Sequence, residues 1–167
     1  CIAYRSLRHS LALWESRLSK KVWMTAAGLT AFVLLQFAVT CRFGFVPYDD
    51  AIHITENRLF AVQESSGFLR AWIMPIQKLF IPLSYSVWAG LARIAQQGIS
   101  GDGYWIYDAT WFHAANVMLH LWNTLWVAAI LRLWIQREFA VGAAAAFFAL
   151  HPLQIEAVAW VSGLRDL

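Results

Sequence analysis

Three uncharged, apolar stretches restrict the fold of this chain more than any other feature. Residues 22–41, 109–131 and 139–155 contain no Asp, Glu, Lys or Arg. A helix needs about 20 predominantly apolar residues to cross the hydrocarbon core of a bilayer, and the short third stretch ends at an interface near Pro152. Hydrophobic residues make up 60% of the chain and charged residues only 14%, which excludes an ordinary soluble domain. We therefore predict an all-α integral membrane protein with three transmembrane helices.

Basic residues are concentrated beside these stretches and predict how the chain is oriented. Residues 1–21 contain five Lys or Arg and a single acidic residue, and the short segment 132–138 contains two more basic residues. Because basic residues favour the cytoplasmic ends of membrane helices, we expect a cytoplasmic N-terminus and a cytoplasmic turn at 132–138. Residues 42–108 and 156–167 then lie on the outer face, periplasmic or luminal. Since membrane topology explains the charge, we expect no nucleic-acid partner.

The long outer segment contains a further apolar run, residues 79–92, which is too short to be another span. The run is 14 residues long and is bounded by Lys78 and Arg93. Reading it as a span would also move the basic turn at 132–138 to the outer face. We instead expect amphipathic juxtamembrane helices that lie in the outer interface and are interrupted at prolines. The glycine-rich residues 98–104 are expected to form a flexible loop.

The two cysteines, Cys1 and Cys41, are too few for a disulfide framework. The predicted topology places Cys1 on the cytoplasmic side and Cys41 at the outer boundary, so we expect no disulfide between them. A lipidated Cys1 would have to lie outside the membrane, against the basic residues that follow it. Because no Met precedes Cys1, we expect the chain to be part of a longer one.

Two consecutive acidic residues, Asp49 and Asp50, follow the first span in the sequence FVPYDD. Carboxylates just outside the membrane can act as a general base, bind a cation or orient an acceptor hydroxyl. Asp is also a frequent helix N-cap, and Asp50 directly precedes a segment, AIHITEN, that can begin a helix. The residues alone leave both interpretations open.

The second span has four polar residues, His113, Asn116, His120 and Asn123, at helical spacing. At about 100° per residue they share one face, and their ten-residue separation extends roughly 15 Å along the helix. Polar groups at this depth face protein, water or a bound headgroup rather than lipid. The stripe is interpreted as interhelical hydrogen bonding, as the wall of an active site, or as a ligand set for a metal or pigment. The two His lie about 10 Å apart, which argues against one shared ion.

The ending HPLQIEAVAWVSGLRDL resembles the third-span region of transmembrane and tetratricopeptide-repeat O-mannosyltransferases and of related bacterial multi-span repeat proteins, all in the C-type glycosyltransferase superfamily. FVPYDD resembles the Tyr-Asp-Asp motif of their first outer loop, and WFHAANVMLHLWNTL resembles their second span. Leu164 stands where these proteins usually have Arg, and Arg165 where they have Lys. The matching positions of the ending are His151, Pro152, Glu156, Val158, Ala159, Trp160, Gly163 and Asp166.

The resemblance implies transfer of a sugar from a polyprenyl-phosphate donor to a hydroxyl of a protein acceptor on the outer face. Asp49 or Asp50 would deprotonate or orient the acceptor. Arg165 would balance the donor phosphate, because a guanidinium matches phosphate geometry. His151, Glu156 and Asp166 would shape the mouth of the pocket. Dependence on a divalent cation is left open, and no metal ligands are assigned.

Three spans are too few for the complete fold that this resemblance implies. One hypothesis is that the chain is the N-terminal membrane part of a glycosyltransferase and is not active by itself. The alternative is a truncated, non-catalytic relative that serves as a structural or accessory subunit and binds other membrane subunits. A pigment or haem subunit that uses His113 or His120 is a third hypothesis.

Overall fold

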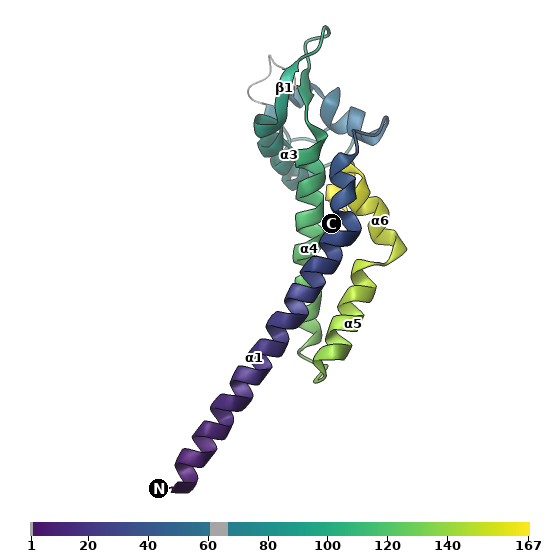
Figure 1. The fold of residues 1–167 in the computed structure, drawn as a ribbon. Helices are drawn as coiled ribbons and strands as arrows, with labels where there is room; N and C mark the ends of the chain where they lie inside the picture. Colours follow the sequence, from purple (N-terminus) through teal and green to yellow (C-terminus); the bar gives the residue numbers. More distant parts are fainter. Residues whose placement is uncertain (1, 61–66) are drawn as a thin grey trace.

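The computed structural model describes residues 2–60 and 67–167. Cys1 lies outside them, so the expected absence of a disulfide between Cys1 and Cys41 remains a prediction. The helices of the elongated half are α1 (Ile2–Phe37), α4 (Ala109–Leu131), α5 (Glu138–Ala149) and α6 (Pro152–Ala159). The other half is called the outer half, because its segments are those predicted to lie on the outer face. It contains α2 (Gly67–Arg70), α3 (Pro82–Ala95), β1 (Gln96–Ile99) and β2 (Trp105–Tyr107). Short helical turns complete the chain: η1 (Ala38–Arg42), η2 (Ala51–Thr55), η3 (Arg58–Phe60) and η4 (Val161–Arg165). Figure 1 shows both halves.

Helices α1, α4 and α5 lie side by side and form the elongated half (Figure 1). Small side chains on α5 allow the three helices to approach closely: buried Ala145 packs with Leu29 of α1 and Ala128 of α4. Nearer the outer half, Val33 of α1 packs against Val117 of α4 in a second buried cluster. The apolar sequence of each helix is therefore used partly for packing between helices.

Two of these helices are long and apolar enough to cross a membrane. They are residues Lys20–Arg42, which include the whole predicted span at 22–41, and Ala109–Leu131, with the predicted bounds. The finding confirms a helical membrane protein. The N-terminus of α1 and the turn between α4 and α5 point toward one end, and the hairpin lies at the other (Figure 1). This arrangement agrees with the basic segments 1–21 and 132–138 lying on the same side of the membrane. That this side is cytoplasmic remains a prediction.

The third apolar stretch differs from the single helix expected over residues 139–155. Helix α5 ends at Ala149, and α6 begins at Pro152 with its axis bent by 58° from that of α5. Proline has no backbone N–H to donate and disfavours helical backbone at the preceding residue, and His151 is accordingly extended, with φ −58° and ψ 133°. The bent pair can be a third span only if both helices belong to one broken span.

The outer half is organised around α3, which lies in the segment where a surface helix was expected at 79–92. Pro82 begins the helix, as proline commonly does at a first helical position. The fully buried Tyr85 and Trp88 pack in one cluster with Phe112 of α4 and Val161 of η4. Helix α3 thereby connects the outer segment to the membrane helices, and its position in the membrane interface remains a prediction.

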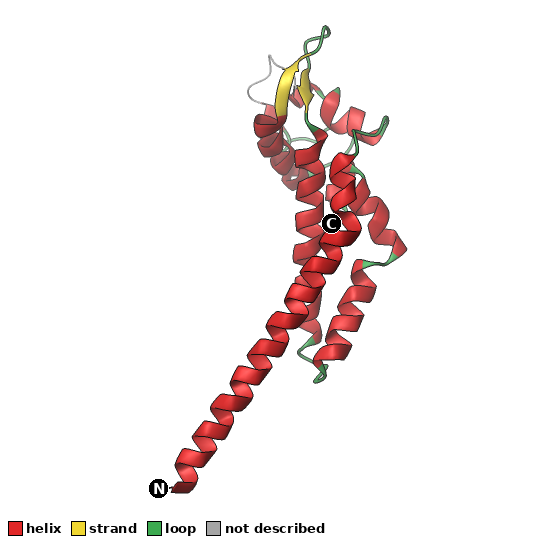
Figure 2. Ribbon diagram, viewed as in Figure 1, coloured by secondary structure: helices red, strands yellow, loops and turns green. Residues whose placement is uncertain are grey.

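Residues 98–104, expected to be a flexible loop, instead form part of a β-hairpin (Figure 2). Strands β1 and β2 pair antiparallel, with Gly98 opposite Ile106 and Ile99 opposite Trp105. The turn between them includes Gly103 at φ +82°, a conformation that glycine adopts without strain. Residues 100–103 form the turn, as a loop would, but Gly98 and Ile99 lie in β1, because the short, β-prone WIY sequence after the turn completes a strand pair that glycine content alone does not predict.

Candidate functional site

A strained backbone position directly precedes the two acidic residues of the first outer turn. Tyr48 has φ 107°, in the left-handed region that residues with a Cβ rarely adopt, at a cost of about 1–3 kcal/mol. Its side chain is exposed, so the conformation serves the path of the backbone rather than the packing of the ring. After this turn the two neighbouring carboxylates are placed differently: Asp50 is buried and Asp49 is partly exposed.

Asp50 joins the first outer turn to the end of the chain. Its Oδ1 accepts the backbone N–H of Ser162 at 2.8 Å, and its Oδ2 accepts the N–H of Val46 at 2.9 Å. The residue is 1% exposed, so both oxygens are held inside the protein. Asp50 precedes η2 but makes no side-chain capping bond to it, and the N-cap expectation was therefore wrong. The carboxylate instead satisfies two backbone donors, one four residues before it and the other 112 residues after it.

Asp49 forms an ion pair with Arg165 at the surface. A guanidinium nitrogen of Arg165 donates to Asp49 Oδ2 at 2.9 Å across 116 residues of sequence. The Asp49 side chain is 35% exposed and the Arg165 side chain 28%, so both are accessible to solvent. Asp166 lies beside them, with its Oδ2 3.6 Å from Arg165 Nε. The structure thus brings together the proposed base of the outer loop and the proposed phosphate ligand of the ending.

A buried His–Tyr pair lies close to these charges. His53 Nδ1 and the Tyr85 hydroxyl share a 2.8 Å hydrogen bond, and the His53 ring stacks on Trp88 with centroids 6.1 Å apart. Burial lowers the pKa of His53, the nearby Arg165 lowers it further, and Asp49 and Asp50 act in the opposite direction. The cluster therefore favours a neutral imidazole next to the Asp49–Arg165 pair.

Burial also raises the pKa of Tyr85 to about 12, against the opposing effects of Arg165 and a hydrogen bond with Asn57. The sequence analysis did not identify His53 or Tyr85. His53 lies four residues after Asp49, which is a helical spacing and a usable signal. Tyr85 lies in a different helix, α3, and no sequence pattern connects it to His53.

A hollow of about 350 Å³ is lined by residues that contact His53 and Tyr85, although neither of those two residues lines it. Asn57, which lines it, donates to the backbone carbonyl of His53 at 3.0 Å. Glu56, Gln77 and Tyr104 contribute further polar groups to the lining. Asn57 and Ile76 therefore separate this polar hollow from the buried pair.

The end of the chain is positioned by a close backbone contact at Gly163. A Cβ at this position would overlap the carbonyl group of Ala157, in α6, so only glycine fits without displacement. Gly163 and Leu164 are buried, and they precede Arg165 within η4. The direction in which Arg165 leaves the core therefore depends on this contact.

The polar stripe of α4 bonds to backbone carbonyl groups of other segments. His113 Nε2 contacts the Gly44 carbonyl oxygen at 3.4 Å, and His120 Nε2 contacts that of Ala149 at 3.1 Å. Asn116 Nδ2 donates to Trp160 O and Asn123 Nδ2 to Leu167 O, each at 2.6 Å. These contacts match the hydrogen-bonding interpretation, and the active-site interpretation of the stripe remains a prediction.

The remaining proposed pocket residues lie at different places. His151 Nδ1 accepts the backbone N–H of Leu153 at 3.4 Å and so caps α6, while its ring packs on Phe147. Glu156 is exposed on α6. Asp166 contacts Arg165, as described above. The structure therefore brings Asp166 to the ion pair and gives His151 a local role in the bend between α5 and α6.

Within residues 2–60 and 67–167, no three His, Cys, Asp or Glu side chains gather in a way that could hold a metal ion. We therefore assign no metal ligands, and the dependence of any reaction on a divalent cation stays open.

The sequence is similar to Protein O-mannosyl-transferase Tmtc1 of Drosophila melanogaster, with 31% identity over 162 residues. The alignment covers 92% of this chain and 18% of the relative, so the chain spans less than a fifth of that protein. No protein-family model matches the chain. No solved structure matches it. The similarity supports a distant glycosyltransferase-like relationship for this chain.

Proposed function

We propose that this chain is the N-terminal membrane part of a glycosyltransferase that transfers a sugar from a polyprenyl-phosphate donor to a protein hydroxyl. The observation that carries the proposal is the 2.9 Å contact between Asp49 and Arg165. It places an accessible carboxylate next to an accessible guanidinium, and these two groups suit deprotonation of an acceptor and neutralisation of a phosphate. The similarity to an O-mannosyltransferase supports the same class of reaction.

The proposed reaction assigns a separate role to each partner. The acceptor hydroxyl gives its proton to Asp49 while its oxygen forms the bond to C1 of the sugar. The bond between C1 and the phosphate oxygen breaks, and polyprenyl phosphate leaves with its negative charge facing Arg165. In this scheme the donor phosphate replaces Asp49 as the partner of Arg165, which frees the carboxylate to act as a base.

Burial separates the two candidate bases. Asp50 is 1% exposed and both of its oxygens accept backbone N–H groups, so an acceptor cannot reach it without opening the joint to Ser162. Asp49 is paired with Arg165 and is partly open to solvent. We therefore assign the base role to Asp49 and make Asp50 the residue that positions it.

The role of Arg165 is tested by titrating the lipid-linked donor against the full protein that carries this chain. We expect Arg165→Gln to raise the donor KM about 10- to 100-fold, the loss of one charge-assisted hydrogen bond. Arg165→Lys should restore most of the affinity, since the resembling proteins have Lys at this position. Arg93→Gln, an equal charge change on an exposed site of α3, is the matched control. An unchanged donor KM in Arg165→Gln would refute the phosphate role.

A structural subunit is the second candidate, because the same contacts also join distant parts of the chain. Trp122 and Trp126 further favour it: they pair at 6.0 Å on α4 and are 59% and 53% exposed, which suits packing against another membrane helix. In this case Asp49→Asn should leave the assembly intact and co-purifying membrane subunits should be found. Loss of transfer with an intact assembly favours the enzyme instead.

A further inference from the structure

The end of the helix bundle opposite the Asp49–Arg165 pair contains two connected hollows between α1 and α5. The first, about 360 Å³, is lined mostly by apolar and small residues, among them Phe32, Gly142 and Ala143. The second, about 600 Å³, is lined by Met24 and Phe139 together with polar and charged residues, among them Lys21 and Arg137. Both hollows share Thr25, Glu138 and Phe139 in their linings. An apolar slot therefore opens directly into a polar cup.

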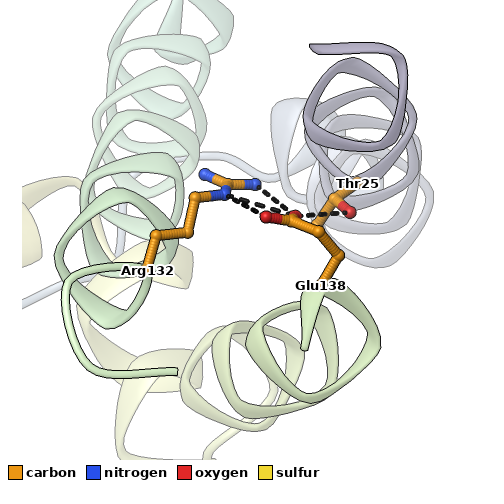
Figure 3. Close-up of polar contacts among 3 residues, drawn as sticks. All are labelled: Thr25, Arg132 and Glu138. Atoms are coloured by element: carbon orange, nitrogen blue, oxygen red, sulfur yellow. Dashed lines mark hydrogen bonds and ion pairs between the residues drawn. The ribbon is translucent and has the colours of Figure 1, made fainter. Parts of the chain in front are cut away.

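The single carboxylate shared by the two hollows is already neutralised. Arg132 donates to both oxygens of Glu138 at 3.2–3.3 Å, and Thr25 donates its hydroxyl at 3.3 Å (Figure 3). These contacts tie the α4–α5 turn to α1. They also mean that Glu138 presents little net charge to a molecule in the cup.

The basic residues of the cup have no such partner. Neither Lys21 nor Arg137 forms an ion pair within the part of the chain that the structure describes, and both are exposed. Lys20 lies next to Lys21 at the start of the apolar span. The cup consequently has an excess of positive charge at the level where lipid headgroups lie.

The apolar slot continues from this level toward the bilayer interior. Its lining runs from Thr25 to Phe32 on α1 and from Glu138 to Ala146 on α5, which corresponds to about 10–12 Å along each helix. The slot exists because Gly28, Gly142 and Ala143 have little or no side chain to fill it. A slender apolar group attached to a negatively charged head matches both hollows at once.

We propose that this groove binds one anionic phospholipid, with its phosphate between Lys21 and Arg137 and one acyl chain between α1 and α5. The site is distinct from that of the proposed reaction, because its lining on α5 begins at Glu138, beside the α4–α5 turn, whereas Arg165 lies in η4, after α6. It therefore does not hold the sugar donor. The bound lipid would fix the spacing of α1 and α5 at the turn that Glu138 holds.

The occupant can be identified by photo-cross-linking. Phe139 lines both hollows and is 90% exposed, so p-benzoylphenylalanine can replace it without disturbing the core. The full protein is placed in phosphatidylcholine nanodiscs that contain a minor fraction of phosphatidylglycerol. The masses of the cross-linked adducts are then measured by mass spectrometry. Adducts enriched in phosphatidylglycerol support the proposal. Adducts in proportion to the lipid mixture, or adducts with another segment of protein, overturn it.

Paired variants separate the headgroup from the acyl chain. Lys21→Gln with Arg137→Gln should weaken phosphatidylglycerol binding about 30-fold, because each basic side chain adds to the attraction of an anionic headgroup. Arg42→Gln with Arg93→Gln makes the same charge change toward the other half and should leave binding unchanged. Equal losses in both pairs overturn the headgroup assignment.

Filling the slot tests the acyl chain. Ala143→Leu should abolish lipid adducts at position 139, since the added side chain occupies the slot. Ala129→Leu, on an exposed position of α4, is the matched control and should leave the adducts unchanged. Retained phosphatidylglycerol adducts in Ala143→Leu overturn the proposed position of the chain.

Discussion

The molecule has two arginine–carboxylate pairs, an inner one beside the α4–α5 turn and an outer one between the turn after η1 and η4, and they differ in what they connect. Arg132 and Glu138 are six residues apart, flank one turn, and are 22% and 14% exposed. Arg165 and Asp49 are 116 residues apart and are 28% and 35% exposed. Glu138 also accepts a hydrogen bond from the Thr25 hydroxyl, whereas the partner of Asp49 among the described residues is Arg165. The inner pair is saturated and suits a structural role, and the outer pair can exchange partners.

The difference extends to the residue beside each carboxylate. At the outer end Asp50 makes the rigid connection, and this leaves Asp49 with little structural duty. At the inner pair, Glu138 itself makes the structural contacts, with Arg132 and Thr25. Asp50 therefore makes the contacts that hold the turn, and Asp49 is positioned by them. This division suits the proposed active site, because a catalytic group must be held in place while its reactive atoms stay available to the substrate.

The largest effect on stability is expected from Asp50→Ala. The change leaves the N–H groups of Val46 and Ser162 without their acceptor in a buried place, at a cost of roughly 2–6 kcal/mol in the free energy of unfolding. Reversible unfolding in mixed micelles measures the loss. Asp102→Ala, in the exposed turn of the hairpin, is the control. If Asp50→Ala and Asp102→Ala have the same free energy of unfolding, the hydrogen bonds of Asp50 do not hold the two segments together.

A smaller effect is expected from Gly163→Ala. The added methyl group meets the backbone of Ala157, and relieving that overlap should cost about 1–3 kcal/mol. The shift should also displace Arg165 and raise the donor KM. Gly101→Ala, where a Cβ meets nothing within 4 Å, is the matched variant. Normal stability and donor affinity in Gly163→Ala would show that this contact does not position Arg165.

Glu138→Gln should have the smaller effect expected of a partly exposed ion pair. Loss of the charge weakens the contacts with Arg132, and we expect a decrease of about 0.5–1.5 kcal/mol in the free energy of unfolding. Sugar transfer by the full protein should stay unchanged, because Glu138 lies at the end away from the proposed site. Asp102→Asn, an equal charge change in the exposed turn of the hairpin, serves as the control. A transfer rate that fell with Glu138→Gln would remove the contrast between the two ends.

The sequence predicted the membrane helices better than it predicted the site. The bounds of α4 follow directly from its uncharged stretch, whereas the single helix predicted over 139–155 is broken before Pro152. The apposition of Asp49 and Arg165 depends on that bend and on the close contact at Gly163, which act together only in three dimensions. Local patterns therefore indicated which residues carry charge, but not which of them meet.

The two acidic residues show the same limit at closer range. Asp49 and Asp50 are adjacent and chemically identical, so residue type cannot separate a base from a positioning group. The turn at Tyr48 and the donors at Val46 and Ser162 make the distinction, and two of these three features lie in the turn itself. The buried partner, Ser162, comes from the far end of the chain. His53 and Tyr85 were missed for a related reason, since their pairing joins η2 to α3.

The most direct test compares Asp49→Asn with Asp50→Asn in the full protein, measuring sugar transfer to a peptide and the free energy of unfolding for both. Because the outer ion pair is partly exposed, Asp49→Asn should change stability by less than about 1 kcal/mol while lowering the transfer rate about 10²- to 10⁴-fold. Asp50→Asn should lower stability and transfer together. Full transfer by Asp49→Asn, or by the double variant, would contradict the assignment of Asp49 as the base.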